Sequence, residues 1–248
     1  MKKLNDIFEF FGSDKHSHDY GQYYEKYFQD KRFLKFNLVE IGILEHPNGP
    51  FGASSLRAWD EYFPNALIHG FDLLDHKRYE TERIKIYVGD QSKREDLRHN
   101  LISNIDEKPQ IIIDDGSHRD AQQQISLGFL FQHLAPGGLY VIEDLTQFSI
   151  SKSSRKLTLA QLPIYGDKDV SPMIFSSAFF SNNENFQIDP YAKFTTSTML
   201  LNYCLTKKIE SQFMYPWEVE YLNQQISFIN IHPSKIFNLN ICFIGKKY

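Results

Sequence analysis

Two short apolar runs in the sequence end in acidic residues, and a histidine closely follows one of them. Residues 111–118 read IIIDDGSH and residues 139–144 read LYVIED. A buried parallel strand is typically a run of β-branched residues with polar residues where it emerges. Ligands of open α/β sheets bind at such carboxyl ends. If the two strands are neighbours, Asp115, Glu143 and Asp144 converge beside His118.

Three carboxylates in one place repel one another unless a cation lies between them. A divalent cation would remove this conflict, and oxygen ligands suit Mg²⁺, with waters and substrate oxygens completing its coordination. His118 could then act as a base beside the ion. The alternative is structural: residues 115–117 would form a turn, and Asp144 would cap a helix.

The elements that must position these residues alternate between strand and helix from residue 36 to residue 145. Strand patterns cover residues 36–43, 67–73, 84–88, 111–114 and 139–143. Helical patterns cover residues 52–63, 93–105 and 121–134. This alternation predicts right-handed crossovers and a parallel sheet.

The C-terminal part adds a predicted helix at residues 197–207 and two strand-like runs at 225–231 and 239–245. A turn signal at residues 232–234, His-Pro-Ser, separates the two runs, which therefore predict an antiparallel hairpin at one edge. The fold expected is α/β: a Rossmann-like, seven-stranded, mostly parallel sheet with helices on both faces.

Polar residues also end the first three predicted strands. Glu40 and Gly42 close the first, and Asp72 ends the second, about where an acid bonds a ribose hydroxyl in nucleotide-binding sheets. Asp90 and Gln91 follow the third and would lie near an adenine. Each could instead be a loop residue or a helix cap. Neither a Gly-x-Gly-x-x-Gly fingerprint nor a Walker loop is present, which disfavours an NAD-dependent enzyme.

The bulk composition is that of an ordinary globular protein. The 248 residues are 42% apolar and 23% charged, with a net charge of −4, which argues against a nucleic-acid partner. Two cysteines without metal-type spacing and an N-terminus unlike a signal peptide indicate a reduced, cytoplasmic protein. No apolar run is long enough to predict a membrane span. Homo-oligomer formation is left open.

These motifs together resemble the class I S-adenosylmethionine-dependent methyltransferases, and among them the metal-dependent sugar O-methyltransferases of the macrocin and mycinamicin type. The resemblance extends over residues 10–146. It rests on GSDK at 12–15 with His18 and Tyr20, EIG at 40–42, Asp72, DDGSH at 114–118, PGG at 136–138 and IED at 142–144. The loop at residues 44–48 is longer and bulkier than the usual glycine loop of such enzymes.

The resemblance implies a role for each of these residues. Catalysis would involve His118 and Asp115. The metal ligands would be Asp115, Glu143 and Asp144. The cofactor contacts would be Lys15, Glu40, Gly42, Ser54, Asp72, Asp90, Gln91 and Asp114. The substrate contacts would be His16, His18 and Tyr20.

The function expected from the resemblance is Mg²⁺-dependent transfer of a methyl group from S-adenosylmethionine to a hydroxyl of a sugar or nucleotide sugar. The setting would be surface-polysaccharide or secondary-metabolite biosynthesis. The alternatives are a metal-independent methyltransferase of a small phosphorylated or amino substrate, and a non-catalytic nucleotide-sugar binding protein. The chain would form one domain: a helical cover at 1–35, a cofactor-binding core at 36–145, a substrate-side insertion and helix at 146–224, and a strand pair at 225–248.

Overall fold

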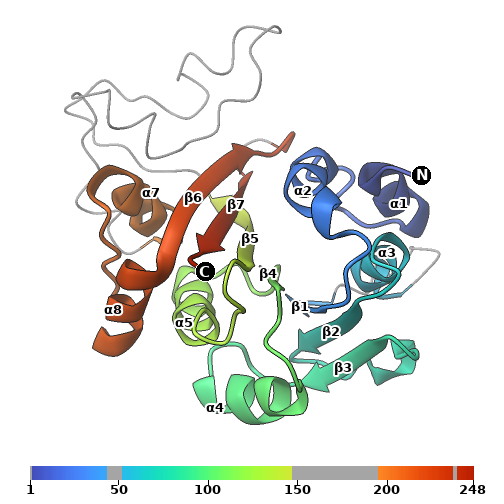
Figure 1. Cartoon of the computed structure of the whole chain (residues 1–248), viewed down its shortest axis with the longest axis horizontal. Coiled ribbons are helices and arrows are strands. Elements are labelled where there is room, and N and C mark those ends of the chain that lie inside the picture. Colours follow the sequence, from blue (N-terminus) through green and yellow to red (C-terminus); the bar gives the residue numbers. More distant parts are fainter. Residues whose placement is uncertain (1, 44–51, 147–194, 237–238) are drawn as a thin grey trace, which may run out of the picture.

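A seven-stranded sheet forms the centre of the protein (Figure 1). The computed structural model describes residues 2–43, 52–146, 195–236 and 239–248. The strands are β1 (Asn37–Ile41), β2 (Leu67–Asp72), β3 (Ile84–Val88), β4 (Ile111–Asp114), β5 (Leu139–Thr146), β6 (Ile226–Pro233) and β7 (Leu239–Lys246). Their order is β3-β2-β1-β4-β5-β7-β6.

The first five strands are mutually parallel, and β7 runs antiparallel between β5 and β6. The chain leaves β1 toward β2 and β3 and later returns to β4 on its other side. Ligands of open α/β sheets bind at such a change of direction, at the carboxyl ends of the strands. The predicted fold class is confirmed.

Helices cover both faces because the central strands are apolar on both sides. Val39 and Ile112 belong to the core on one face, whereas Leu38 and Ile113 belong to the core on the other. Figure 1 shows the N-terminal helices gathered on one side. They are α1 (Leu4–Phe11), α2 (Gly21–Phe28) and α3 (Ser54–Tyr62), with a 3₁₀ turn η1 (Gln29–Lys31) after α2.

Aromatic packing joins these three helices. The Trp59 ring of α3 lies 4.9 Å from the rings of Phe8 in α1 and Tyr24 in α2, with edge-to-face geometry in both pairs. Burial of such rings stabilises this layer. Helices α1 and α2 thus pack on α3.

The other face carries the other α-helices of the described residues and two helical turns. They are α4 (Arg94–Asp96), a π-helical turn η3 (Leu97–Leu101), a 3₁₀ turn η4 (Ile102–Asn104), α5 (Asp120–Leu130), α7 (Thr196–Thr206) and α8 (Pro216–Gln225). A further 3₁₀ turn, η2 (Lys77–Tyr79), follows β2. None of the helices in the described part of the chain has the length and apolarity to cross a membrane.

Two local predictions differ from the structure, and one helix was not predicted. The helix expected at 93–105 is a succession of α, π and 3₁₀ turns, and α8 was not predicted. The turn expected at 232–234 begins later, because His232 and Pro233 still pair with β7. β6 is an edge strand, where proline is tolerated. The insertion predicted after residue 146 lies largely outside the described residues.

Candidate active site

The carboxyl ends of β1, β4 and β5 meet beneath the N-terminal segment, defined here as residues 12–20. Strands β4 and β5 are direct neighbours, with Asp114 opposite Ile142 in the ladder. The acidic residues that follow them therefore gather in one region, as the sequence predicts. The structure divides them into an inner and an outer cluster.

The inner cluster surrounds Lys15, whose side chain is only 1% exposed. Its Nζ lies 3.2 Å from Oε1 of Glu40 and 2.7 Å from Oε1 of Glu143, and it also pairs with Asp115. The Tyr24 hydroxyl donates a hydrogen bond to Glu143. The protein thus supplies an internal cation for Asp115 and Glu143, two of the residues that were predicted as metal ligands.

Burial and the neighbouring charges shift the pKa values of this cluster in opposite directions. Burial by itself lowers the pKa of Lys15, but the surrounding carboxylates raise it well above its usual range. Burial raises the pKa of Glu143 to about 7, although the ammonium of Lys15 favours its ionised form. A buried ammonium with this many carboxylates stays charged.

The outer cluster surrounds Asp144. Its Oδ1 accepts a hydrogen bond of 2.8 Å from the Tyr20 hydroxyl and lies 3.3 Å from Nδ1 of His18. Its Oδ2 lies 4.0 Å from Nε2 of His118. Potential ligand atoms of Asp115, His118 and Asp144 all lie within 4.8 Å of one another.

A β-bulge explains why two consecutive acids belong to different clusters. Ile142 pairs with Cys242 and Leu145 with Asn240, so Glu143 and Asp144 share the place of a single residue on β7. Asp144 takes a left-handed conformation with φ of 51°. His118 is also left-handed, with φ of 56°. Such strained residues persist only where packing imposes them, and they gather at functional sites.

The predicted metal ligands are therefore only partly brought together. Asp115 belongs to both clusters, Asp144 faces His118, and Glu143 faces Lys15. Across both clusters, the carboxyl groups of Glu40, Asp115, Glu143 and Asp144 outnumber the single ammonium of Lys15. This excess and the oxygen donors fit a hard divalent cation on the outer side.

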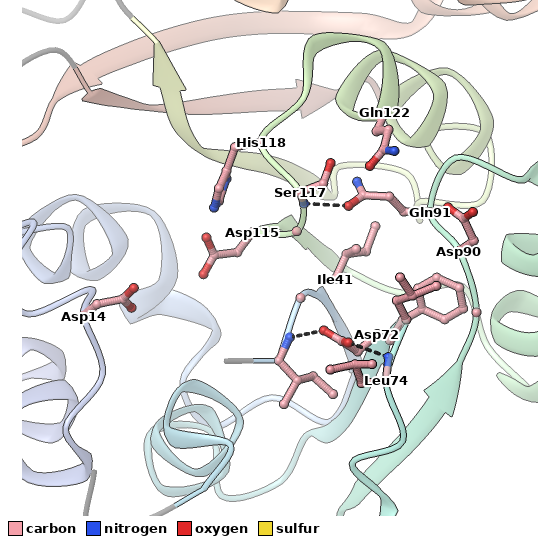
Figure 2. Close-up of a pocket in the computed structure, with 16 residues that line it drawn as sticks. Asp14, Ile41, Asp72, Leu74, Asp90, Gln91, Asp115, Ser117, His118 and Gln122 are labelled. Carbon is pink, nitrogen blue, oxygen red and sulfur yellow. Dashed lines mark hydrogen bonds between the residues drawn. The ribbon is translucent and has the colours of Figure 1, made fainter. Parts of the chain in front are cut away.

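A cavity of about 450 Å³ extends from the outer cluster along the ends of the parallel strands (Figure 2). Sites for small molecules commonly have volumes of about 300–1,000 Å³. Four predicted cofactor contacts lie on its wall: Gly42, Asp72, Asp90 and Gln91. Asp115 and His118 line the same cavity. Six of the residues predicted for the site therefore line one cavity.

The other four predicted cofactor contacts lie off this wall. Lys15, Glu40 and Asp114 are buried with 1% exposure or less, and Ser54 is buried at the start of α3. Asp114 accepts hydrogen bonds from Ser126 (2.8 Å) and from Nε2 of Gln91 (3.1 Å). Its role in the structure is to hold Gln91.

Gln91 in turn fixes the loop after β4. Its Oε1 accepts a hydrogen bond of 2.8 Å from the backbone N–H of Ser117 (Figure 2). Gly42 supports the same loop from β1. Its φ is +91°, and a Cβ there would lie 2.1 Å from the carbonyl oxygen of Asp115. Only glycine allows this close approach.

Asp72 organises the opposite wall. Its two carboxylate oxygens accept hydrogen bonds of 2.8 Å from the backbone N–H groups of Ile43 and Leu74 (Figure 2). Leu73 and Leu74 line the cavity and are about two-thirds exposed, at 68% and 64%. Exposed leucines beside polar anchors suit the flat face of a ligand.

Comparisons with known proteins bear on these features. No family model matches the chain. It is 38% identical over 128 residues to the mycinamicin VI 2''-O-methyltransferase of Micromonospora griseorubida, which covers 52% of this chain and 32% of that protein. It is 41% identical over 137 residues to the 8-demethyl-8-alpha-L-rhamnosyl tetracenomycin-C 2'-O-methyltransferase of Streptomyces olivaceus, covering 54% and 35%. The chain thus matches about a third of the length of these curated relatives.

The chain also resembles a solved structure, that of the MycE methyltransferase from the mycinamycin biosynthetic pathway in complex with Mg, SAH and mycinamycin VI. The alignment covers 99% of this chain and 55% of the MycE chain. The TM-score is 0.67 and the identity is 25%. The chain has a class I methyltransferase fold. The resemblance to macrocin- and mycinamicin-type enzymes that the sequence indicates is confirmed at this level.

The N-terminal segment of this methyltransferase fold contributes differently from the sequence prediction. His18 and Tyr20 reach Asp144, whereas His16 lies beside Asn5 and Glu9. None of these three predicted substrate contacts lines the cavity. Asp14, Gln122 and Tyr24 were not assigned, although the first two line the cavity and the third bonds Glu143. Tyr24 follows Tyr20 by one helical turn, and this spacing could have identified it.

Proposed function

We propose that the protein is an S-adenosylmethionine- and Mg²⁺-dependent O-methyltransferase that acts on a hydroxyl of a sugar or nucleotide sugar. The observation that supports this most is the continuity of the cavity. It joins the polar ends of β1, β2 and β3 to the acidic cluster that contains His118. The relatives named above are O-methyltransferases by name, the second of a rhamnosyl compound, and MycE is described with Mg and SAH.

The cofactor would lie along the ends of the parallel strands. Asp72 would accept hydrogen bonds from the ribose hydroxyls, as acids at the end of this strand do in related sheets. Asp90 and Gln91 would lie beside the adenine, and Gly42 would leave room for the amino-acid part. This direction places the methyl group toward Asp115, at the acidic end of the cavity.

The metal would be held by Asp115, Glu143 and Asp144, as proposed from the sequence. Because Lys15 and Tyr24 both bind Oε1 of Glu143, this residue would have to use its other carboxylate oxygen, Oε2. Asp115 and Asp144 are the two that face His118, so they would make the contacts nearest the acceptor. A bound Mg²⁺ lowers the pKa of a coordinated hydroxyl and orients neighbouring oxygens. Tyr20 and His18 would hold Asp144 in place through its Oδ1.

His118 would be the general base. Its side chain is 40% exposed, lines the cavity and has Asp144 4.0 Å from Nε2. It would accept the proton that the acceptor hydroxyl loses as its oxygen takes the methyl group, while the cofactor leaves as a neutral thioether. The carboxylate of Asp144 would stabilise the imidazolium. Correct alignment of the two reacting groups supplies much of the remaining rate.

Two measurements test this function. Calorimetry should detect binding of S-adenosylhomocysteine, and transfer of a labelled methyl group should be found with a panel of nucleotide sugars and glycosides. A chelator should abolish transfer while leaving binding intact. Full transfer in excess chelator would favour the metal-independent alternative, and binding of nucleotide sugars without any transfer would favour the non-catalytic one.

The biosynthetic setting, the cellular location and the oligomeric state are proposals as well. A sugar acceptor would place the reaction in surface-polysaccharide or secondary-metabolite biosynthesis. The cytoplasmic location and the division of the chain at residues 35, 145 and 224 rest on the sequence alone. Whether the protein forms a homo-oligomer is a question for measurements in solution.

A further inference from the structure

Two consecutive residues of the N-terminal segment point to different surroundings. Lys15 is buried among the carboxylates of the inner cluster. Asp14 is exposed and lines the cavity. Within the GSDK motif at residues 12–15, the sequence predicts that Lys15 makes the cofactor contact. The structure therefore offers a different residue of the same motif to a ligand.

Lys15 anchors the segment that carries Asp14. Its ion pairs connect the segment to the ends of β1, β4 and β5. The carbonyl oxygen of Asp14 accepts hydrogen bonds from the Ser17 hydroxyl (2.7 Å) and from the backbone N–H of His18 (3.0 Å). The backbone of Asp14 is thus held in place, and its side chain is directed to the cavity by the turn.

The carboxylate of Asp14 makes no hydrogen bond or ion pair with any residue that the structure describes. Its negative charge acts on Asp115, whose pKa is raised first by burial and then by neighbouring carboxylates that include Asp14. In Figure 2, Asp14 lies on the Asp115 side of the cavity, away from Asp90. An unpartnered anion beside other carboxylates favours a cationic ligand group.

We propose that Asp14 binds the α-ammonium group of S-adenosylmethionine. This inference rests on the proposed function, which puts the adenosine at Asp72 and Asp90 and the amino-acid part at the other end. That part carries an ammonium and a carboxylate. An ionised aspartate only accepts hydrogen bonds, so it pairs with the ammonium. Lys15, fully engaged by the inner cluster, is not available to the ligand's carboxylate.

The test compares two ligands that differ at the proposed contact. S-adenosylhomocysteine carries the ammonium, whereas 5'-methylthioadenosine keeps the adenosine and the thioether and lacks the whole amino-acid group. Calorimetry of the full chain with Asp14→Asn should show S-adenosylhomocysteine binding about tenfold more weakly, as expected for an exposed charge-assisted hydrogen bond. Binding of 5'-methylthioadenosine should be unchanged.

The matched control is Asp19→Asn. Asp19 lies in the same segment, pairs with Lys235 at 3.0 Å and does not line the cavity. Its φ of 60° suits asparagine, so the backbone should be preserved. This variant removes the same charge and should leave the affinity for both ligands unchanged.

Three results would decide against the inference or its basis. An unchanged affinity of Asp14→Asn for S-adenosylhomocysteine would overturn it. An equal loss of affinity for both ligands would also overturn it, because the substitution would then have weakened binding by disturbing the fold. If the unmodified protein bound 5'-methylthioadenosine but not S-adenosylhomocysteine, the proposed function itself would fail.

Discussion

The ammonium of Lys15 lies 2.7 Å from Oε1 of Glu143, and both side chains are buried. This ion pair joins the N-terminal segment to the carboxyl end of β5. It also resolves part of the charge conflict among the acidic residues without a metal. The outer cluster around Asp144 contains no such ammonium, and it reaches the cavity through Asp115 and His118.

Lys15→Met should destabilise the protein by about 3 kcal/mol or more, because removal of one partner leaves buried carboxylates without their cation. Urea unfolding would measure this loss. The matched control is Lys2→Met, since Lys2 forms an exposed ion pair of 3.0 Å with Glu61. Such a surface pair contributes about 1 kcal/mol or less. Equal stabilities of the two variants would contradict the account of the inner cluster.

His118→Ala should lower the rate of methyl transfer by about 10²–10⁴-fold, the usual contribution of a general base. Affinity for S-adenosylhomocysteine should change little. His99→Ala, which removes an exposed imidazole in η3, is the control and should retain full activity. If His118→Ala kept its turnover while a folded His18→Ala variant was inactive, the base would be His18.

Asp72→Ala should weaken binding of S-adenosylhomocysteine by about ten- to a hundredfold, which corresponds to about 1.4–2.8 kcal/mol of hydrogen bonding. Part of the loss would come from the two backbone N–H groups, of Ile43 and Leu74, that Asp72 also binds. Calorimetry with adenosine alone should show a similar loss. Unchanged affinity for both ligands would remove Asp72 from the cofactor site.

Asp144→Asn should weaken binding of Mn²⁺, used as a spectroscopic substitute for Mg²⁺, by about tenfold or more, because affinity follows the charge of the ligands. Asparagine tolerates the left-handed backbone at this position, so the bulge should be preserved. Paramagnetic resonance would measure free Mn²⁺ in a titration. The Asp19→Asn variant should bind Mn²⁺ as the unmodified protein does, and equal affinities of all three proteins would make the outer cluster structural.

His232 should make stability depend on acid pH. Burial lowers its pKa to about 3, whereas an unfolded histidine has a pKa of about 6.5. The unfolded state therefore binds more protons, so this contribution is complete above about pH 6.5 and is lost as the pH falls toward 3. His232→Gln should reduce the loss of unfolding free energy between pH 7 and pH 5.

The difference between the two proteins isolates His232, because other groups, including His69 with a pKa of about 4, titrate in both. Urea unfolding at several pH values would measure it. His99→Gln, at an exposed position, should leave the pH dependence unchanged. If the unfolding free energy of His232→Gln declined with falling pH in parallel with that of the unmodified protein, His232 would not be held neutral by burial.

The sequence by itself determined the strands and the polar residues at their ends. Apolar runs and turn signals are local, so β1 to β5 could be placed within a few residues of their observed bounds. Parallel strands bring their carboxyl ends to one edge, and this rule assigned Asp72, Asp90, Asp115 and His118 to one cavity. The C-terminal strand pair was predictable for the same reason, although His232 extends β6 beyond the expected turn.

Tertiary structure alone decided which charges meet. Lys15 reaches Glu143 because α1 and α2 pack on α3, which is a long-range arrangement that no local spacing encodes. The bulge in β5 depends on pairing with β7, nearly a hundred residues later, and it separates Asp144 from Glu143. A side chain's direction depends on the backbone conformation of its own residue. For this reason Asp14, beside Lys15 in the sequence, faces the cavity while Lys15 lies in the core.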